Sequence, residues 1–272
     1  MQQTSPHQPI TSKENKAVKY LRSLSDPKYR KKECAFLIEG IKMVEDAIRD
    51  GLGVIRIFAT PDLVQHHGKS ILKLTETIPT EILWISRNLM YAISANKTPQ
   101  PVLAVVKKNE YDEDTLLNHA SGLIVIAYQL QDPGNLGTII RTAEAVGAAG
   151  VIVTANTVDP YNAKTIRASM GSILRLPIIQ IRDSAAFIQV CKQRGYQTIA
   201  AVLRGEKSQF DVDLKKPTVL MLGQEGSGLP QNIMPLVDLQ VHIPMSGTVE
   251  SLNVATAAAV LLYEVMRQRL NK

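Results

Sequence analysis

The sequence of 272 residues contains only two cysteines, Cys34 and Cys191, and they lie far apart in the chain. Neither belongs to a CxxC motif or adjoins a cluster of histidines, so the sequence predicts neither a zinc site nor a disulfide framework. We expect both to be buried free thiols. His66 and His67 adjoin a glycine, which favours a surface turn over a pair of metal ligands. No metal is therefore predicted.

Long apolar runs are also missing. No stretch of about 18 or more apolar residues could cross a membrane as a helix. The first residues, MQQTSPHQPITSKENK, lack both the apolar core of a signal peptide and the arginine-rich helix of a transit peptide. These absences predict a soluble, cytoplasmic protein. A hydrophobic content of 45% is sufficient for one large domain or for two ordinary ones.

The basic charge is concentrated near the start of the chain. The formal net charge is +6, and residues 13–32, KENKAVKYLRSLSDPKYRKK, hold eight basic and two acidic residues, which accounts for all of it. Ala17, Tyr20, Leu21 and Leu24 recur at helical spacing within this segment. The opposite side of the predicted helix carries Lys16, Lys19 and Arg22. Such a face is either plain solvated surface or an arm that contacts phosphates of a nucleic acid.

Residues 34–106 alternate between short apolar runs and helical patterns. The apolar runs are CAFLIEG, VIRIFAT, EILWIS and VLAVV, and helical patterns such as IKMVEDAIRDG separate them. This alternation predicts an α/β domain with a largely parallel sheet, which we place at residues 1–108. Residues 109–121 are polar and acidic and predict a linker or a linking helix.

Residues 122–272 form a second predicted α/β domain. It begins with GLIVIAYQL, a run of β-branched residues typical of a buried strand. Further strands are predicted at VIVTA, YQTIAAV, TVLMLG and LQVHIPM. Helices are predicted over residues 136–146, NAKTIRASMG, SAAFIQVCKQRG and residues 251–270.

Three of these strands end in loops of unusual composition. GLIVIAYQL is followed by QDPGNLG, TVLMLG by QEGSGLP, and LQVHIPM by SGTVESLN. Ligands of open α/β sheets bind beyond the carboxyl ends of the strands. Loops rich in Gly, Asn and Ser with little charge predict a pocket of main-chain N–H and C=O groups for a hydrogen-bonding ligand. The sequence contains neither a P-loop nor a GxGxxG motif after the first strand, so a triphosphate or pyrophosphate ligand is not predicted. No Ser/His/Asp catalytic triad is visible either.

The three loops also carry a family likeness. DPGNLGTIIRTAEAVGA, VLMLGQEGSGLP and IPMSGTVESLNVATAAAVLLYE closely resemble, in order and spacing, the motifs of the SpoU/TrmH family of S-adenosylmethionine-dependent RNA ribose 2′-O-methyltransferases, in the SPOUT superfamily. The likeness covers roughly residues 122–266. FLIEGIKMVEDAIRDG and TPQPVLAVV resemble the substrate-binding domain of that family, whose fold is similar to some ribosomal proteins. Pro101 stands there in place of an expected glycine.

The resemblance implies an architecture that periodicity cannot show. It implies a parallel sheet whose C-terminal segment threads through a loop to form a trefoil knot, which is an exception to the usual rules of chain topology. It also implies a homodimer with the last helix in the interface, in which each site takes residues from both chains. A threaded segment beside the cofactor has to be slim and nearly uncharged, as GTVESLNVATAAA is.

The resemblance also implies roles for individual residues. It implies catalytic roles for Arg141, Asn135, Glu225, Ser251 and Asn253. It implies that S-adenosylmethionine is held mainly by main-chain groups of Leu222, Gly223, Ile243, Met245 and Leu252. The candidate RNA-binding residues are Lys16, Lys19, Arg22, Lys28 and Arg30. A guanidinium stays protonated, with a pKa above about 12, so we expect Arg141 to stabilise the developing alkoxide or to fix a phosphate rather than to take the proton.

Other interpretations stay open at the level of sequence. Glu225, Ser251 and Asn253 are also suitable helix caps. The chain could be a non-catalytic RNA-binding protein on the same fold, or an enzyme of another class such as a dinucleotide-dependent dehydrogenase. Ribosomal RNA is favoured over transfer RNA because of the additional N-terminal domain, which is an argument from family analogy.

Overall fold

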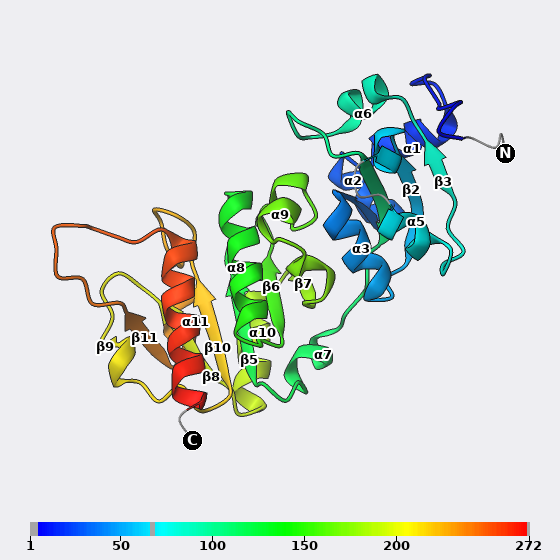
Figure 1. The fold of residues 1–272 in the computed structure, drawn as a ribbon. Coiled ribbons are helices and arrows are strands. Elements are labelled where there is room, and N and C mark those ends of the chain that lie inside the picture. Colours follow the sequence, from blue (N-terminus) through cyan, green and yellow to red (C-terminus); the bar gives the residue numbers. More distant parts are fainter. Residues whose placement is uncertain (1–4, 66–68, 271–272) are drawn as a thin grey trace. The chain divides into compact units, whose positions relative to one another are not determined.

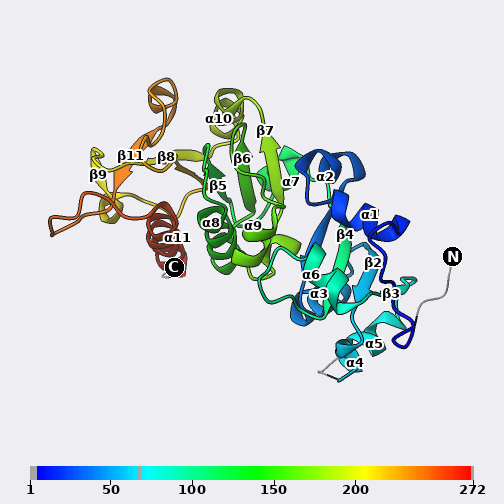
Figure 2. The ribbon, with the colours of Figure 1, turned by 90° about the horizontal axis from the view of Figure 1, so that it is seen from above.

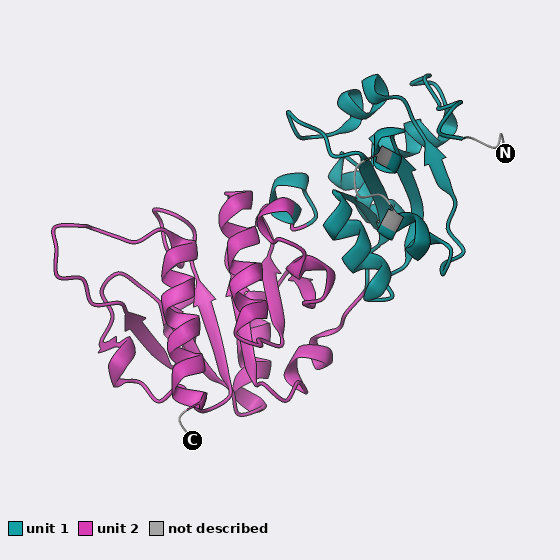
Figure 3. Cartoon of the chain, viewed as in Figure 1, with its two compact units in different colours: residues 1–109, 161–166 teal, residues 110–160, 167–272 magenta. Residues whose placement is uncertain are grey.

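The structure is a computed structural model that describes residues 5–65 and 69–270, so the turn predicted at His66 and His67 lies outside it. The chain divides into two compact units (Figure 3). Unit 1 comprises residues 1–109 and 161–166, and unit 2 comprises the remaining residues. None of the helices in the described ranges is long and apolar enough to span a membrane.

Unit 1 contains a four-stranded sheet in the order β1-β4-β2-β3 (Figure 1). Its strands are β1 (Ala35–Glu39), β2 (Val54–Ala59), β3 (Ile82–Trp84) and β4 (Val102–Lys107). β2 pairs with β3 in parallel, but β4 is antiparallel to both β1 and β2. The predicted largely parallel sheet is therefore wrong for β4. The alternation of strands and helices indicates a common direction for β1, β2 and β3, whereas nothing in the local pattern shows that the last strand enters between β1 and β2 in reverse.

The helices of unit 1 are mostly short. They are α1 (Lys16–Ser23), α2 (Pro27–Glu33), α3 (Ile41–Arg49), α4 (Asp62–Gln65), α5 (Lys69–Thr75) and α6 (Arg87–Ile93). The predicted amphipathic helix is α1, which begins after Asn15, whose side chain accepts a hydrogen bond from the N–H of Ala17. Val18, Leu21 and Leu24 of this segment are buried in a cluster with residues of the sheet. The basic side of α1 is thus left facing solvent.

Unit 2 is built on a seven-stranded sheet in the order β7-β6-β5-β10-β8-β11-β9. Its strands are β5 (Leu123–Ala127), β6 (Gly150–Thr154), β7 (Ile178–Ile181), β8 (Gln197–Ala201), β9 (Lys207–Ser208), β10 (Thr218–Leu222) and β11 (Leu239–His242). Every neighbouring pair is parallel, which confirms the predicted parallel sheet. The edge strands β7 and β9 are absent from the strands predicted above, since each is short and has no clear apolar alternation.

Helices cover both faces of this sheet. They include α8 (Pro133–Ala145), α10 (Ser184–Gln193) and α11 (Val254–Leu270). The shorter helices in this part of the sequence are α7 (Glu113–Leu117) and α9 (Ala163–Ala168), and residues 163–166 of α9 belong to unit 1. α8 and α11 lie side by side on one face, and α10 lies on the other (Figures 1 and 2). α7 falls within the range predicted as a linker, and its Leu116 and Leu117 are buried in the core of unit 2. α8 and α11 each begin three residues away from the predicted start, α8 earlier and α11 later.

The two cysteines differ in their surroundings. Cys191 on α10 is fully buried in the core cluster of unit 2, as predicted, and burial raises the pKa of its thiol to about 12. Cys34, which ends α2, is only partly buried, so the prediction of a buried thiol is wrong at this position. It adopts a left-handed backbone conformation with φ of 46°, which places it at the surface turn before β1.

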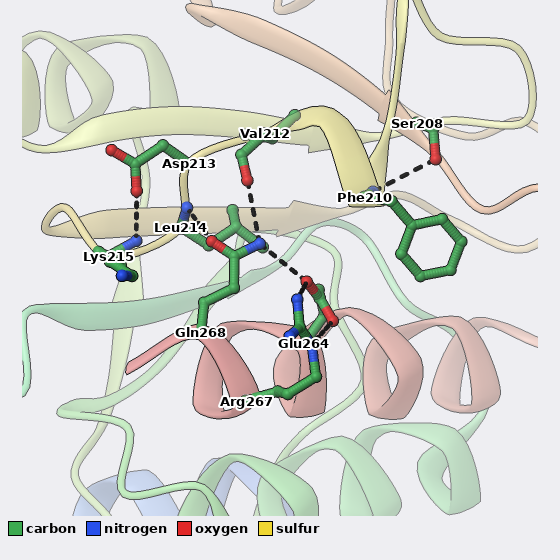
Figure 4. Close-up of polar contacts among 9 residues, drawn as sticks. All are labelled: Ser208, Phe210, Val212, Asp213, Leu214, Lys215, Glu264, Arg267 and Gln268. Carbon is green, nitrogen blue, oxygen red and sulfur yellow. Dashed lines mark hydrogen bonds and ion pairs between the residues drawn. The ribbon is translucent and has the colours of Figure 1, made fainter. Parts of the chain in front are cut away.

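The C-terminal end of α11 is fixed by polar contacts. Gln268 Nε2 donates to the carbonyl of Val212 at 3.0 Å, and its Oε1 accepts from the N–H of Leu214 at 2.8 Å (Figure 4). Arg269 donates to four main-chain carbonyls, those of Ser121, Gly122, Leu214 and Lys216. These contacts hold the last helix against two other segments of unit 2, residues 121–122 and 212–216, and burial lowers the pKa of the Arg269 guanidinium.

Candidate active site

The strands that precede the three motif loops end at one level of the sheet. Leu222 at the end of β10 pairs in register with Ala127 of β5 on one side and with Ala201 of β8 on the other. Ala201 is in turn level with Val241 of β11. Because all these strands are parallel, their carboxyl ends share an edge, and the three loops start from it.

A chain of hydrogen bonds joins the three loops through their side chains. Asn253 Nδ2 donates to Asn135 Oδ1 at 3.0 Å. Asn135 Nδ2 donates to Glu225 Oε1 at 2.8 Å. One residue from each motif therefore takes part, and both polar ends of the Asn135 amide are used. We call Asn253, Asn135 and Glu225 the three-motif chain.

Local sequence explains why these side chains point into the site. Asp132 accepts a hydrogen bond from the N–H of Asn135 at 2.9 Å, and Pro133 occupies the first turn, so α8 begins just before Asn135. Asn253 Oδ1 accepts from the N–H of Ala255 at 2.9 Å and caps α11. The capping role proposed for Asn253 is thus present together with its bond to Asn135.

The capping alternatives for the other two residues do not hold. Glu225 caps no following helix; its two carboxylate oxygens accept from Asn135 and, at 3.4 Å, from the N–H of Gln131. Ser251 is exposed and lies outside α11. Its side chain makes no hydrogen bond within residues 5–65 and 69–270.

The glycines of the second motif serve the loop itself. A Cβ on Gly223 would lie 2.3 Å from the carbonyl carbon of Gly228, so no larger residue fits there. Gln224 and Gly228 exchange two main-chain hydrogen bonds of 2.8 and 3.1 Å, which close a tight turn. Gly226 and Gly228 have φ of +87° and +68°, in the left-handed region that favours glycine. The close approach that requires glycine at position 223 is therefore made by the chain's own backbone.

Arg141 lies on α8 apart from the three-motif chain. It is exposed, and its side chain makes no hydrogen bond or ion pair with any residue in the described ranges. It follows Asn135 by six residues, which is roughly 9 Å along a helix axis. The structure therefore brings Asn135, Glu225 and Asn253 together, and in the described ranges the side chains of Arg141 and Ser251 make no hydrogen bond to them.

The residues expected to hold the cofactor offer free main-chain groups. Leu222 is buried at the end of β10, and its carbonyl already accepts a hydrogen bond from Tyr128 at 2.8 Å. Within the described ranges, no hydrogen bond involves the other four, which are Gly223, Ile243, Met245 and Leu252. The Nδ1 atom of His242, just before Ile243, is buried without a partner in the described ranges. This set of unused polar groups fits a ligand bound through main-chain hydrogen bonds.

The other chemistry of the site is limited to uncharged polar groups and single charges. Among the residues that the structure describes, no three His, Cys, Asp or Glu side chains are grouped as metal ligands. A shallow depression on unit 2 is lined by Phe210, Asp211, Val212, Asp213, Lys215, Arg267 and Gln268. It lies at the far end of α11, roughly 20 Å along the helix from Asn253, so it is separate from the three-motif chain.

Gln131 belongs to the site although the sequence gives little reason to single it out. Its main-chain N–H contacts Glu225, and its side chain contacts two main-chain carbonyls of neighbouring loops. The available signal is its place directly before Asp132 in the first motif. Its contacts depend on the loop after β6, which no motif includes.

The basic arm in unit 1 has four of its five predicted residues on the surface. Lys16, Lys19, Arg22 and Lys28 are exposed. Arg30 is only 8% exposed, and its guanidinium donates to the carbonyls of Leu24 and Ser25 at 2.7 and 2.8 Å. This placement contradicts the predicted phosphate contact of Arg30, because the group is used to join the end of α1 to α2.

Comparison with protein families assigns both halves of the chain. Residues 122–263 match the model of the SpoU rRNA Methylase family. Residues 15–104 match the model of the MRM3-like substrate binding domain. The first match includes all three motif loops and the second includes most of unit 1.

Individual relatives are similar over nearly their whole length. An uncharacterized tRNA/rRNA methyltransferase of Synechocystis is 34% identical over 98% of this chain and 96% of the relative. The 23S rRNA (guanosine(2553)-2′-O)-methyltransferase RlmP of Bacillus subtilis is 32% identical over 94% of this chain and 98% of its own. The crystal structure of the SpoU methyltransferase AviRb from Streptomyces viridochromogenes, in complex with AdoMet, has a TM-score of 0.86 at 30% identity, and covers 94% of this chain and 98% of that one.

Proposed function

The chain belongs to the SpoU rRNA methylase family, and from this premise we propose that it methylates a ribose 2′-hydroxyl of RNA with S-adenosylmethionine as the methyl donor. The ribose oxygen bonds to the methyl carbon, the carbon–sulfur bond of the donor breaks, and the hydroxyl proton is released. The observation that carries the proposal is the three-motif chain, because it joins the three motif loops at the carboxyl edge of a parallel sheet.

The substrate that we propose is ribosomal RNA of the 23S type. Two lines of support involve unit 1. Relatives that match over almost the full length, unit 1 included, carry names that specify 2′-O-methylation of 23S rRNA. Unit 1 matches a substrate-binding domain and carries the basic arm. We assign residues 1–108 to RNA binding, residues 109–121 to a linker and residues 122–272 to methyl transfer.

Catalysis of this displacement rests mainly on orientation. An in-line attack needs the ribose oxygen and the methyl carbon held close and aligned, which can supply roughly 7–11 kcal/mol of the barrier. We assign Asn135, Asn253 and Glu225 to holding the ribose, with Glu225 as an acceptor for the hydroxyl. Ser251 lies two residues before Asn253, and we assign it to RNA contact.

Arg141 has a different role from the three-motif chain. A guanidinium does not act as a base at neutral pH. We assign it to a phosphate of the substrate or to the developing alkoxide, where a fixed positive charge lowers the transition-state energy. Its exposure, and the lack of a partner among the described residues, leave its donors available for that contact.

S-adenosylmethionine supplies an electrophilic methyl group on a sulfonium. We assign its binding to main-chain groups of Leu222, Gly223, Ile243, Met245 and Leu252, at the ends of β10 and β11 and before α11. Support comes from the free main-chain groups of the last four and from the AdoMet-bound relatives.

RNA binding is assigned to the exposed part of the basic arm. Lys16, Lys19, Arg22 and Lys28 are all on the surface of α1 and α2. Arg30 is excluded from this group because its donors are used within the chain.

The assembly that we propose is a homodimer through the C-terminal unit, with a knotted chain and a cytoplasmic location. α11 packs on α8 with one face and exposes Tyr263 and Leu270 on the other, at 53% and 70%. For the knot, the support is the family likeness, together with the strand order, in which β11 lies beyond β10 and β8 from β5, and the packing of α11 on α8. A second copy would bring further residues to each site.

The test is transfer of a tritiated methyl group from S-adenosylmethionine to total RNA, with S-adenosylhomocysteine affinity measured in parallel. The RNA should come from a strain that lacks the gene. Label in 23S rRNA that is alkali-stable, as a 2′-O-methyl ribose is, and absent with Arg141→Ala, is the expected result. Binding of RNA without any label transfer would favour a non-catalytic RNA-binding protein, and label confined to transfer RNA would overturn the assigned substrate.

A further inference from the structure

Gln131 makes an unusual pair of contacts at the edge of the sheet. Its single Nε2 atom donates to the carbonyl of Gln129 at 2.8 Å and to the carbonyl of Asn156 at 2.7 Å. Gln129 follows β5 and Asn156 follows β6, and these two strands are neighbours. The side chain therefore ties the first motif loop to a loop that lies outside all three motifs.

Both acceptor residues have strained backbones. Gln129 and Asn156 are two of four non-glycine residues with positive φ in the described ranges, at 52° and 65°. Such conformations cost energy for a residue with a Cβ, and they persist where surrounding contacts hold them. Here both donors of one amide are used on the carbonyls of these two residues. Strain held in this way is typical of functional sites.

Further bonds tie the same two loops. Thr154 Oγ1 accepts from the N–H of Gln129 at 3.0 Å, and Thr157 Oγ1 donates to the carbonyl of Ala127 at 3.2 Å. The N–H of Val158 donates to the carbonyl of Leu130 at 2.8 Å. Residues 155–158 thus form a fourth loop at the carboxyl edge of the sheet.

The turn held in this way meets the carboxylate of Glu225. The N–H of Gln131 contacts Glu225 Oε2 at 3.4 Å, while Asn135 Nδ2 contacts Oε1 at 2.8 Å. The two oxygens are thus approached from two points of the first motif loop. Rotation of the carboxylate would lengthen one of these contacts.

We propose that Gln131 is a positioning residue of the methyl transfer: by fixing the turns at Gln129 and Asn156 with one amide, it sets the orientation in which Glu225 meets the acceptor ribose. The proposal rests on the proposed function. Gln131 acts through Glu225 and does not itself contact the reacting atoms. The role requires two donor hydrogens on one atom, which an amide has and a carboxylate lacks.

The decisive variant is Gln131→Glu, which keeps the length and shape of the side chain and removes both donors. Gln131→Asn keeps two donors on a side chain that is one methylene shorter, and should recover part of the rate. Gln193→Glu, on the exposed end of α10, is the matched control for the added charge. Thr157→Val removes another tie between the same loops without touching Gln131.

Rates of tritium transfer to total RNA give apparent kcat and KM for each variant. We expect Gln131→Glu to lower kcat at least tenfold, because loosening the two loops disturbs the orientation of Glu225. The KM for RNA and the affinity for S-adenosylhomocysteine should change less than about threefold, because the residues assigned to RNA and cofactor binding are kept. Gln193→Glu should match wild type, and Thr157→Val should lose less than Gln131→Glu. Hydrogen exchange should rise in both residues 129–132 and 155–158 of Gln131→Glu, while its melting temperature stays near that of wild type.

Three results would overturn the proposal. The first is a kcat for Gln131→Glu within twofold of wild type. The second is an equal loss of kcat with Thr157→Val, which would mean that any hydrogen bond between the two loops has the same effect as those of Gln131. The third is unchanged exchange in residues 155–158. A wild-type protein that transfers no label to any RNA would instead sink the proposed function, and the catalytic role of Gln131 with it.

Discussion

The side chains of Asn253 and Asn135 meet through a hydrogen bond of 3.0 Å although 118 residues of sequence separate them. Each residue stands at the beginning of a long helix, Asn253 before α11 and Asn135 in the first turn of α8. The two helices pack side by side, so the bond joins their amino-terminal ends. It leaves Asn135 Nδ2 free for Glu225 and fixes which way the amide faces.

A double-mutant cycle tests whether Asn135 and Glu225 act as a unit. Asn135→Ala and Glu225→Ala should each reduce kcat, and the double variant should lose much less than the product of the two effects. Residues in direct contact couple by about 0.5–3 kcal/mol, and the 2.8 Å bond places this pair in that class. The measurement is the rate of methyl transfer at saturating S-adenosylmethionine. Strictly multiplicative losses would show that the two side chains work independently.

Arg141 is expected to affect the rate and not the fold. Arg141→Ala and Arg141→Lys should both lower kcat by about 10²-fold, because a fixed guanidinium near developing charge contributes roughly 3 kcal/mol and a lysine cannot reproduce its geometry. The unfolding free energy should change by less than about 0.5 kcal/mol, since the side chain is exposed. Denaturant unfolding checks the second point. A large loss of stability would assign Arg141 to structure instead.

Lys16, Lys19 and Arg22 should contribute to RNA affinity through charge alone. Their joint replacement by glutamine should weaken binding and lower the slope of log K against log salt by about 2–3, because each phosphate contact adds roughly 0.7–0.9 to that slope. Affinity for S-adenosylhomocysteine should stay the same. The salt dependence of RNA binding, followed by fluorescence anisotropy, is the measurement. An unchanged slope would show that the basic face of α1 is solvated surface that does not contact RNA.

Arg30 should behave differently from its basic neighbours. Arg30→Ala leaves the carbonyls of Leu24 and Ser25 without their donor, so it should reduce the unfolding free energy by about 1–3 kcal/mol. Lys28, two residues before Arg30 on α2, is exposed. Lys28→Ala is therefore the matched control and should leave the unfolding free energy nearly unchanged. Equal effects of the two variants on stability would contradict the structural role of Arg30.

The two thiols should differ in reactivity. The thiolate is the reactive form, and burial raises the pKa of Cys191 to about 12, so this residue should not react with a disulfide reagent in the folded protein at pH 8. Cys34 is partly exposed and should react. We expect one reactive thiol in the native protein and two after unfolding in guanidinium chloride. Two equally fast thiols in the native state would show that Cys191 is accessible.

Asp238 should make stability depend on pH. Burial raises the pKa of this carboxyl, but hydrogen bonds from Lys192 and Thr198, at 2.9 and 2.7 Å, outweigh it and leave the pKa below its ordinary value. The ionised form therefore stabilises the folded state above the unfolded pKa of about 3.9, and this stability is lost as the pH falls through the lower folded pKa. Asp238→Asn should cost about 1 kcal/mol at pH 7, since the pair is partly exposed, and progressively less as the pH falls below the unfolded pKa of about 3.9. Urea unfolding at a series of pH values checks this, and a constant difference would contradict it.

Much of the fold of unit 2 could be predicted because its signals are local. The run Leu123–Ala127 is apolar throughout, as a strand covered on both faces has to be, and the helix predicted over residues 136–146 corresponds to α8, which begins three residues earlier. Short edge strands such as β9 carry too few residues to show a period. In unit 1 the direction of β4 was not predictable from the alternation of elements, because alternation does not specify where a final strand is inserted.

The candidate site was predicted as a set of residues and not as a set of contacts. The motifs place Asn135, Glu225 and Asn253 in loops at the same edge of the sheet. The structure adds which of their atoms form hydrogen bonds. Arg30 shows the limit of charge patterns, since a basic run does not reveal which of its members turns inward to bond to carbonyls. Gln131 shows a similar limit for loops, because the motif does not reveal that its side chain bonds to the carbonyls of Gln129 and Asn156.

By itself the sequence determined most of the strands of unit 2, the approximate positions of its long helices, the three motif loops and the family to which they belong. The tertiary structure alone decided the reversal of β4, the burial of Arg30, the three-motif chain and the contacts of Gln131 with Gln129 and Asn156. The physical reason is the separation along the sequence of the residues that interact. A strand or a cap is specified by neighbours within a few residues, whereas contacts between loops depend on strand order and register, which are set when distant segments pack together.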